Sequence, residues 1–434
     1  MRNVLIMGAA GKDFHVFNTC YRDDPDARVI AFTATQIPNI DGRRYPPQLA
    51  GPRYPEGIGI HPESQLAELV RARKIDDVVF AYSDVSYDYV AGRRALAEGA
   101  GARFHLADPD RTMIPSARPV VAVCAVRTGC GKSQTTRKVA QILRARGKRV
   151  VVVRHPMPYG DLVAQEVQRF ATLDDLERHR CTIEEMEEYE PHLRSGSVVY
   201  AGIDYAKILA RAEAEADVIL WDGGNNDTPF YRPTLHLVVA DPHRAGHEVT
   251  YHPGRVNFER AHVIVINKIG TATPEGIATV CANAARMNPR AVVIRADSPV
   301  TADRPELIAG RRVLVIEDGP TTTHGDMTFG AGTLAARRHG AKEIVDPRPF
   351  AVGSIADTFR KYPKTGPLLP AMGYDDHQVR DLEATINACD CDAVVVGTPV
   401  NLSRFLRIEK PVVRVTYELA EIGKPDLVDV LARI

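Results

Sequence analysis

Short apolar runs rich in β-branched residues alternate with amphipathic stretches along the chain. In the first 107 residues the helical patterns cover 63–74 and 87–99, and the apolar runs lie at 4–7, 29–33, 77–81 and 102–106. Strands separated by helices predict a parallel, doubly wound sheet. We therefore expect a Rossmann-like N-terminal domain over 1–117. Residues 38–62, rich in proline, glycine, arginine and tyrosine, predict a long loop.

A second α/β pattern begins at residue 119. Its nine candidate strands, with helices between them, are 119–126, 149–153, 217–221, 235–240, 263–266, 291–295, 313–316, 393–396 and 412–415. One large sheet and two fused sheets both fit this pattern. The acidic helical stretch 184–190 predicts a solvated helix face.

The first strand of this second pattern leads into the segment Arg-Thr-Gly-Cys-Gly-Lys-Ser at 127–133, and a helical stretch follows as far as Gly147. A strand, a glycine-rich turn and a helix start direct several backbone N–H groups at one point, which suits a phosphate. Lys132 would meet the β- and γ-phosphates and Ser133 the Mg²⁺. The predicted nucleotide-binding residues here are Thr128, Gly129, Cys130, Gly131, Lys132, Ser133 and Gln134.

This loop departs from the usual P-loop because Val126 stands where a glycine is normally found. Arg127 lies where the signature lysine lies in dimeric P-loop ATPases and GTPases that resemble MinD and the nitrogenase iron protein. That likeness implies a catalytic contact from Arg127 to phosphates across a homodimer, which a guanidinium group suits. The alternative is a glycine-rich turn with a chance Lys-Ser pair. We expect a P-loop NTPase domain over 118–434, with 310–434 as an α/β extension or subdomain.

Two aspartates that follow strands are candidates for metal binding or catalysis beside the triphosphate. Asp222 ends the apolar strand 217–221 and precedes Gly223 and Gly224, as a Walker B residue that holds Mg²⁺ would. An aspartate that merely begins a turn is the alternative. Asp161 follows the strand 149–153 and corresponds to a catalytic switch-loop aspartate of the MinD-like group, or else to an ordinary surface turn.

Further polar residues follow other strands. Arg154 and His155 come directly after the strand 149–153 and could bind an anionic second substrate. Asn267 and Lys268 resemble the base-reading Asn-Lys-x-Asp element of GTPases, but Gly270 replaces the aspartate that would specify guanine. The residues therefore leave the base open, and we expect ATP, with GTP possible.

A second glycine-rich turn follows the first strand of the chain. Gly11 precedes Lys12 and His15, which would place positive groups at an anion cradle, although a tight turn that only packs a helix on a strand is the alternative. His324 belongs to a further loop, 317–325, that combines acidic, glycine and hydroxyl residues and would face a ligand.

Composition limits the classes of partner. The 434 residues carry 55 basic and 55 acidic side chains, so no net field attracts nucleic acid or an anionic membrane. The seven cysteines are scattered without a framework, as expected in a reducing compartment. The first apolar stretch is too short for a signal peptide or a membrane span. We expect a cytoplasmic protein that binds neither nucleic acid nor membrane.

Taken together, these motifs resemble the cyclic 2,3-diphosphoglycerate synthetase family. The likeness rests on the segments 8–15, 127–133, 221–227, 267–268, 317–321, 370–374 and 397–399 and covers nearly the whole chain. It implies an ATP- and Mg²⁺-dependent ligase that closes 2,3-diphosphoglycerate, or a related small phosphorylated acid, into a cyclic phosphoanhydride and releases ADP and phosphate. Such an anionic substrate needs fixed cations. The candidates for these cations are Lys12, His15, Arg154, His155 and His324, and Gly11 is a further predicted substrate-binding residue.

A different class of function fits the same motifs. In a nucleotide-switched regulatory or metallochaperone-like GTPase, hydrolysis would change the shape of the protein rather than make a product. Substrate-stimulated phosphate release separates this alternative from the ligase.

Overall fold

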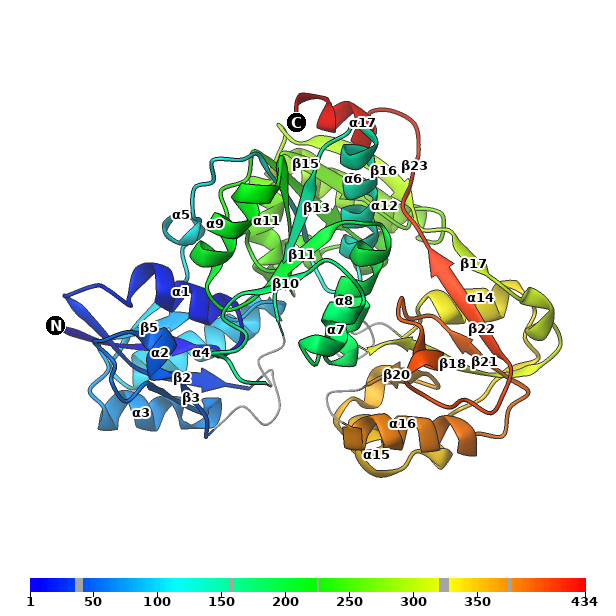
Figure 1. Cartoon of the computed structure of the whole chain (residues 1–434), viewed down its shortest axis with the longest axis horizontal. Helices are drawn as coiled ribbons and strands as arrows, with labels where there is room; N and C mark the ends of the chain where they lie inside the picture. Colours follow the sequence, from blue (N-terminus) through cyan, green and yellow to red (C-terminus); the bar gives the residue numbers. More distant parts are fainter. Residues whose placement is uncertain (36–41, 157–159, 225, 320–327, 373–375) are drawn as a thin grey trace.

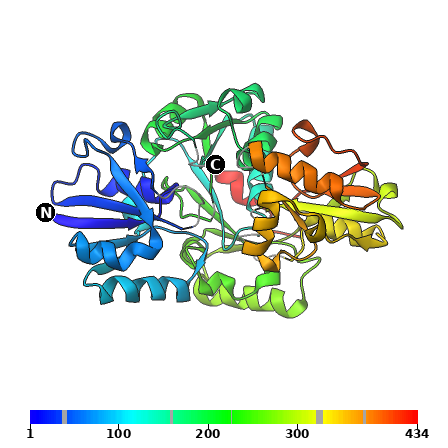
Figure 2. The ribbon, with the colours of Figure 1, turned by 90° about the horizontal axis from the view of Figure 1, so that it is seen from below.

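The computed structural model describes residues 1–35, 42–156, 160–224, 226–319, 328–372 and 376–434. Three larger sheets with their helices follow one another along these residues, and the N-terminal and C-terminal sheets lie on opposite sides of the central one (Figures 1 and 2). A fourth, two-stranded sheet pairs β6 (Val85–Ser86) with β14 (Tyr251–His252). This arrangement confirms the predicted class, a Rossmann-like sheet followed by a P-loop-type α/β domain with an α/β extension. No helix among the described residues is long and apolar enough to cross a membrane.

The N-terminal sheet has the strand order β3-β4-β2-β1-β5-β7, and only β3 runs antiparallel to its neighbour. Its strands are β1 (Arg2–Met7), β2 (Ala27–Ala34), β3 (Arg44–Tyr45), β4 (Ile58–Pro62), β5 (Asp77–Phe80) and β7 (Arg103–Leu106). Its helices are α1 (Lys12–Cys20), α2 (Pro47–Ala50), α3 (Leu66–Ala72), α4 (Tyr87–Gly99) and α5 (Pro109–Thr112).

The prediction of a loop over 38–62 is wrong, because the described part contains β3, α2 and β4. Ile58 and Ile60 are both buried, each 2% exposed, and β4 pairs parallel with β2. This alternation of buried residues is a strand signal. The high proline and glycine content of the neighbouring turns obscured that signal in the sequence.

The central sheet has the order β10-β11-β9-β12-β8-β13-β15-β16-β23. Its strands are β8 (Val120–Ala125), β9 (Val150–Arg154), β10 (Gln168–Phe170), β11 (Val198–Ala201), β12 (Val218–Gly223), β13 (Leu235–Ala240), β15 (Val263–Ile266), β16 (Val292–Asp297) and β23 (Ala420–Glu421). Its longer helices are α6 (Lys132–Ala145), α8 (Ile183–Arg194), α9 (Tyr205–Glu215), α11 (Gly254–Arg260) and α12 (Pro274–Met287), and the shorter ones are α7 (Asp174–Arg178), α10 (His247–Thr250) and α17 (Leu427–Val430).

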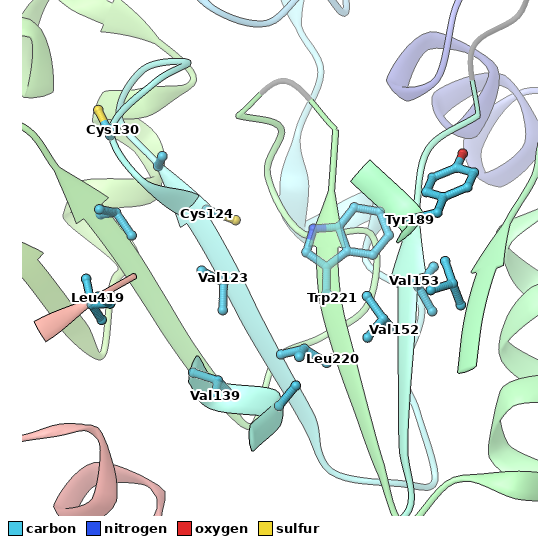
Figure 3. Close-up of a cluster of buried hydrophobic side chains, with 14 of the residues drawn as sticks. Val123, Cys124, Cys130, Val139, Val152, Val153, Tyr189, Leu220, Trp221 and Leu419 are labelled. Carbon is cyan, nitrogen blue, oxygen red and sulfur yellow. The ribbon is translucent and has the colours of Figure 1, made fainter. Parts of the chain in front are cut away.

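The core of this sheet explains its continuous apolar runs. Every residue of β8 and β12 is buried, and Figure 3 shows Val152, Val153, Leu220 and Trp221 side by side in one cluster. Strands that are covered on both faces need apolar residues at successive positions. β8 and β12 pair in parallel, so their carboxyl ends, and the residues that follow them, meet at one edge of the sheet.

The C-terminal sheet is separate from the central one. The strands after residue 119 therefore form two sheets and not one large sheet. Its order is β17-β22-β21-β18-β19, and β20 also pairs with β18. The strands are β17 (Val300–Ala302), β18 (Arg312–Asp318), β19 (Glu343–Ile344), β20 (Leu369–Ala371), β21 (Ala393–Val396) and β22 (Val412–Tyr417). The helices are α14 (Ala331–Arg338), α15 (Gly353–Lys361) and α16 (Asp376–Ala388). The chain then returns to the central sheet through β23 and α17, as the red segment of Figure 1 shows.

Candidate functional site

The glycine-rich turn after β8 has the geometry of a P-loop. Gly131 has a φ of +105° and immediately precedes α6, which begins at Lys132. A side chain there would be strained by this φ and would collide with the amides of Asn267 and Gln134. The turn therefore requires glycine at this position, and the helix N-terminus behind it favours an anion.

Lys132 and Asp222 are brought together, as predicted. The Lys132 ammonium donates to the backbone carbonyl and to Oδ1 of Asp222, both at 2.7 Å. The Thr136 hydroxyl donates to the same Oδ1 at 2.8 Å. This juxtaposition follows from the parallel pairing of β8 with β12, which places both residues at the carboxyl edge of the sheet.

Two further groups face the Asp222 carboxylate. Arg154 forms a buried ion pair with Oδ2, and His192 lies 3.2 Å from the same oxygen. Burial alone would raise the pKa of Asp222, but Arg154 and Lys132 hold that pKa well below its usual range. The carboxylate is therefore ionised. The second guanidinium nitrogen of Arg154 pairs with Glu188, so the charge of Arg154 is already neutralised by carboxylates.

The residues at the P-loop fit Mg²⁺ only as partial ligands. Ser133 lines the pocket, and Asp222 supplies an ionised carboxylate. Among the described residues no group of three or more His, Cys, Asp or Glu side chains is placed to hold a metal by itself. Mg²⁺ commonly takes one or two protein oxygens and completes its shell with phosphates and water. The donor set fits an ion that arrives with a nucleotide.

Arg127 contacts residues of its own chain. Its Nε donates to Asp84 Oδ1 at 2.6 Å, its Nη1 lies 2.9 Å from His247 Nδ1, and its guanidinium stacks on Tyr251 at 3.7 Å. The other Asp84 oxygen accepts the backbone N–H of Thr128 at 3.3 Å. Sequence reasoning missed Asp84, which follows β5 with a φ of +59°. A contact across a dimer stays a prediction.

Asn267 and Lys268 support the P-loop from beneath. The fully buried Asn267 amide donates to the Cys130 carbonyl at 2.9 Å. The Lys268 ammonium donates to the Gly129 carbonyl at 2.5 Å and to Asp241 Oδ2 at 2.9 Å. Their predicted base-reading role stays a prediction, and in this structure both side chains fix the shape of the phosphate-binding turn.

One pocket joins the P-loop to the C-terminal sheet. Of the predicted residues, Arg127, Thr128, Gly129, Gly131, Lys132, Ser133, Gln134 and Lys268 line it. Its other walls carry the apolar and aromatic residues Val300, Phe329, Leu334 and Tyr417 and the carboxylates of Glu184, Glu187, Glu188, Glu317 and Asp318. An apolar wall next to a phosphate turn suits a nucleotide.

The prediction that residues 184–190 form a solvated face is wrong. Glu184 is 1% exposed and Glu187 is 6% exposed, because α8 lies between the central and C-terminal sheets (Figure 1). The Glu187 carboxylate forms a short hydrogen bond with the Thr398 hydroxyl. Burial, with repulsion from Asp318, raises the pKa of Glu187 well above its usual value.

Glu317 is a fixed acceptor at the pocket wall. Its Oε1 accepts the backbone N–H of Thr333 at 2.7 Å and the Thr333 hydroxyl at 2.8 Å. The two oxygens of the Glu317 carboxylate also accept the backbone N–H groups of Gly330 and Gly332. The carboxylate thus caps the start of α14 and joins β18 to that helix.

The residues predicted to bind the second substrate separate into two groups. Gly11, Lys12 and His155 lie together where α1 meets the central sheet, and His15 lies beside them. The His15 ring stacks on Phe230 at 4.0 Å, its Nε2 lies 2.8 Å from the Thr112 carbonyl, and burial lowers its pKa to about 3. Arg154 belongs instead to the Asp222 network.

Asp161 is not brought to this pocket. Asp161 is exposed, and its carboxylate accepts the backbone N–H groups of Val163 and Ala164 at 2.9 and 3.4 Å, which caps a local turn. His324 lies outside the described residues.

Comparisons with known proteins give one extensive match. No family model matches the chain. Over 430 residues the chain is 60% identical to arginine synthetase ArcE of Thermococcus kodakarensis, and the match covers 99% of this chain and 96% of that protein.

Two solved structures are more distantly similar. LpxK of Aquifex aeolicus, solved in complex with ATP, has a TM-score of 0.42 and 12% identity and covers 74% of this chain and 90% of its own. The hydrogenase maturation factor HypB of Archaeoglobus fulgidus has a TM-score of 0.27 and 19% identity and covers 42% of this chain and 81% of its own.

Proposed function

Since the chain belongs to the family of arginine synthetase ArcE, we propose that it is an ATP-dependent ligase that makes arginine. Replacing one terminal nitrogen of the guanidinium group by oxygen turns arginine into the ureido amino acid L-citrulline. Transfer of the γ-phosphoryl group to that oxygen forms a phosphorylated isourea and ADP. Ammonia then attacks the isourea carbon and displaces inorganic phosphate. Atoms and charges balance as citrulline, ATP and ammonium giving arginine in its guanidinium form, ADP, phosphate and a proton.

The charges around the site carry this proposal. Facing the P-loop, the pocket wall presents five acidic side chains, those of Glu184, Glu187, Glu188, Glu317 and Asp318. Glu188 pairs with Arg154, and burial raises the pKa of Glu187 and of Glu317, so the negative charge of this wall is smaller than its number of acidic side chains. Carboxylates repel a phosphorylated acid and attract ammonium or guanidinium groups. A compound that ends in nitrogen therefore fits the space beside the phosphates better than a polyanion does.

Apart from Lys12, the predicted cations that the structure describes are already neutral or paired. Burial lowers the pKa of His15 to about 3 and that of His155 well below its usual value, so both rings are uncharged at neutral pH. Arg154 is held between Asp222 and Glu188. A substrate with about five negative charges needs several free fixed cations. This is why arginine formation is preferred to the ring-closing reaction that the sequence resemblance implies.

The nucleotide would occupy the P-loop end of the pocket. Lys132 is placed to exchange Asp222 for the β- and γ-phosphates, and the backbone N–H groups of the turn would hold the phosphate oxygens. Ser133 and Asp222 would hold Mg²⁺, which when bound neutralises phosphate charge. ATP is preferred to GTP because Gly270 leaves guanine without its specifying carboxylate.

Glu187 is suited to handle the proton of the nitrogen nucleophile. Its buried carboxyl has a raised pKa and lines the same pocket as Lys132. A carboxylate with a raised pKa is a stronger base than an ordinary carboxylate. We propose that Glu187 takes a proton from ammonium, so that ammonia with a free electron pair attacks the activated carbon.

A direct assay tests the proposed function. The purified protein is incubated with Mg²⁺, ammonium and either ATP or GTP, with L-citrulline in one arm and 2,3-diphosphoglycerate in the other. Formation of ADP and arginine in equal amounts supports the proposal. Chromatography and mass spectrometry measure both products. A new cyclic species in the phosphorus spectrum of the second arm supports the ring-closing ligase instead. Hydrolysis that neither compound stimulates supports a nucleotide switch.

A further inference from the structure

A buried polar cluster lies where the N-terminal domain meets the central sheet. It contains Lys12 at the start of α1, His155 after β9 and Asp227 after β12. The His155 ring occupies the space beside Gly11 on one side and Gly224 on the other, where a Cβ on Gly224 would come within 2.8 Å of Nδ1. The absence of side chains at both glycines therefore allows the three polar residues to converge.

Several polar atoms of this cluster are buried without a partner. Lys12 is 4% exposed and Asp227 is 5% exposed. Within the described part of the chain, Lys12 Nζ, Asp227 Oδ1 and His155 Nε2 make no hydrogen bond. A buried ammonium and a buried carboxylate oxygen each lose hydration energy that a hydrogen bond would restore. Three such atoms in one interface point to a ligand rather than to a purely structural contact.

The cluster adjoins the proposed nucleotide pocket. Gly224, against which His155 packs, lines that pocket, and Asn226 next to Asp227 lines it too. The charges of Lys12 and Lys132 both act on the Asp227 carboxylate and lower its pKa, although burial has the larger, raising effect. A ligand anchored at Lys12 and Asp227 would thus lie near the residue assigned to the γ-phosphate.

The charges define the kind of ligand. Lys12 is a donor to a carboxylate, at the N-terminus of a nine-residue helix whose dipole also favours negative charge. Asp227 is an acceptor for an ammonium group. Asp13 adds a second acid whose carboxylate already accepts the N–H groups of Ala10 and Phe14, both at 2.7 Å. Because Asp13 is bound in this way, Lys12 and Asp227 are left as one cation and one acid that each keep an atom without a partner among the described residues. Such a pair does not suit a polyanion, but it matches a molecule that carries one charge of each sign.

We propose that Lys12 and Asp227 bind the α-carboxylate and the α-ammonium group of an amino-acid substrate, with His155 as an additional hydrogen-bonding partner. This inference rests on the proposed function, which supplies an amino acid with a reactive group at the far end of its side chain. The head group would be anchored at the domain interface, and the side chain would extend past Gly224 toward the phosphates.

Substrates that lack one end of the molecule test this assignment. L-Citrulline carries both the head group and the ureido group, N-propylurea only the ureido group, and L-norvaline only the head group with a plain side chain. The variants are Lys12→Met, which keeps the stem, and Asp227→Asn, which keeps the shape. Asp13→Asn is the matched control, because it removes a neighbouring charge that already has its own partners.

We expect each of the two variants to raise the KM for L-citrulline about 10- to 100-fold, the usual effect of losing one charged hydrogen bond. Binding of L-norvaline, measured by calorimetry, should weaken to the same extent. The KM for ATP and the turnover of N-propylurea should be unchanged, as should the kinetic and binding parameters of Asp13→Asn. Thermal unfolding of Lys12→Met should occur at the same or a higher temperature, because an unpaired buried charge is removed. A structural role alone predicts no such division between substrates.

The two proposals fail in distinguishable ways. If the wild-type protein makes arginine from L-citrulline while both variants keep the wild-type KM, the head group binds elsewhere and this inference is overturned. If the wild-type protein makes no arginine, the proposed function fails. Calorimetry with L-arginine and L-norvaline then decides: binding that is lost in Lys12→Met supports the head-group site, and binding that is absent or unaffected overturns it.

Discussion

Arg127 of the P-loop and Asp84 of the N-terminal domain form an ion pair with 2.6 Å between Nε and Oδ1 and with side chains only 2% and 6% exposed. Asp84 also accepts the N–H of Thr128, so one carboxylate of the N-terminal domain holds two consecutive residues of the phosphate-binding turn. The N-terminal domain thereby supports the geometry of the glycine-rich turn directly.

This ion pair should contribute measurably to stability. Asp84→Ala leaves a buried guanidinium without its carboxylate, and breaking such a pair typically costs about 3–5 kcal/mol. Arg127→Met should cost a similar amount, and the double variant less than the sum of the two. Urea unfolding of the four proteins measures the coupling free energy. Strictly additive effects would mean that the two side chains do not interact in solution.

The same geometry predicts how Arg127→Ala affects activity. Because the guanidinium is bound within its own chain, we expect the loss of turnover to be the same at every protein concentration. We retain a homodimer as a proposal, in which Arg127 would reach phosphates of the partner subunit. That role requires an activity loss that changes as the dimer dissociates. Activity assays over a dilution series, with sedimentation at the same concentrations, separate the two cases.

Lys132→Met should lower turnover strongly and leave the fold intact. The substitution removes a charge that would stabilise the transferred phosphoryl group, and losing one such group typically lowers the rate about 100- to 1000-fold. Asp222 would keep Arg154, Thr136 and His192 as partners. Steady-state kinetics and circular dichroism measure the two effects. Retained activity would exclude the P-loop role.

Asn267→Ala distinguishes support of the loop from recognition of the base. Its amide bonds the Cys130 carbonyl, and leaving that acceptor unsatisfied typically costs about 1–3 kcal/mol. If the side chain only supports the turn, affinity for ATP and for GTP should fall by the same factor. Calorimetric titration with both nucleotides measures the ratio, and a change in that ratio would show that Asn267 contacts the base.

Asp13 should make stability depend on pH. Burial raises the pKa of this carboxyl from 3.8 to about 7, so between these values the folded protein binds a proton that the unfolded chain has released. Stability is therefore lost as the pH rises through this window, by up to about 1.4 kcal/mol per pH unit. The neighbouring titratable groups Asp227, Lys12 and His155 are present in both wild type and Asp13→Asn. The difference in stability between the two proteins therefore reports on Asp13.

Unfolding measured from pH 4 to pH 8 tests this expectation. The wild type should lose stability relative to Asp13→Asn up to about pH 7, and the difference should stay constant above it. A difference that does not change with pH would show that Asp13 titrates normally.

Local chemistry explains what could be predicted. The turn before Lys132 follows from glycine positions between a strand and a helix, and the position of Asp222 follows from a neighbouring parallel strand. Both depend on contacts that are close in sequence or on the regular geometry of parallel sheets. The predicted site at the carboxyl edge therefore has its two main residues in contact.

Residues whose roles depend on distant partners could not be assigned in this way. Asp84 lies in an ordinary-looking turn, and its role depends on where the N-terminal domain packs. The acidic residues of α8 predict a solvated helix face, because charged side chains on a helix usually face water. Here a second sheet covers that helix, and Thr398, Arg154 and Arg404 become partners of its carboxylates.

The sequence by itself determined the α/β class, the phosphate-binding turn and the aspartate that faces it, because these follow from local periodicity and backbone geometry. Only the tertiary structure decided the charge of the space around that turn. Burial neutralised the histidines, ion pairs neutralised Arg154, and α8 and β18 brought carboxylates to the pocket. Charge balance depends on which groups meet in three dimensions, and long-range packing alone brings them together.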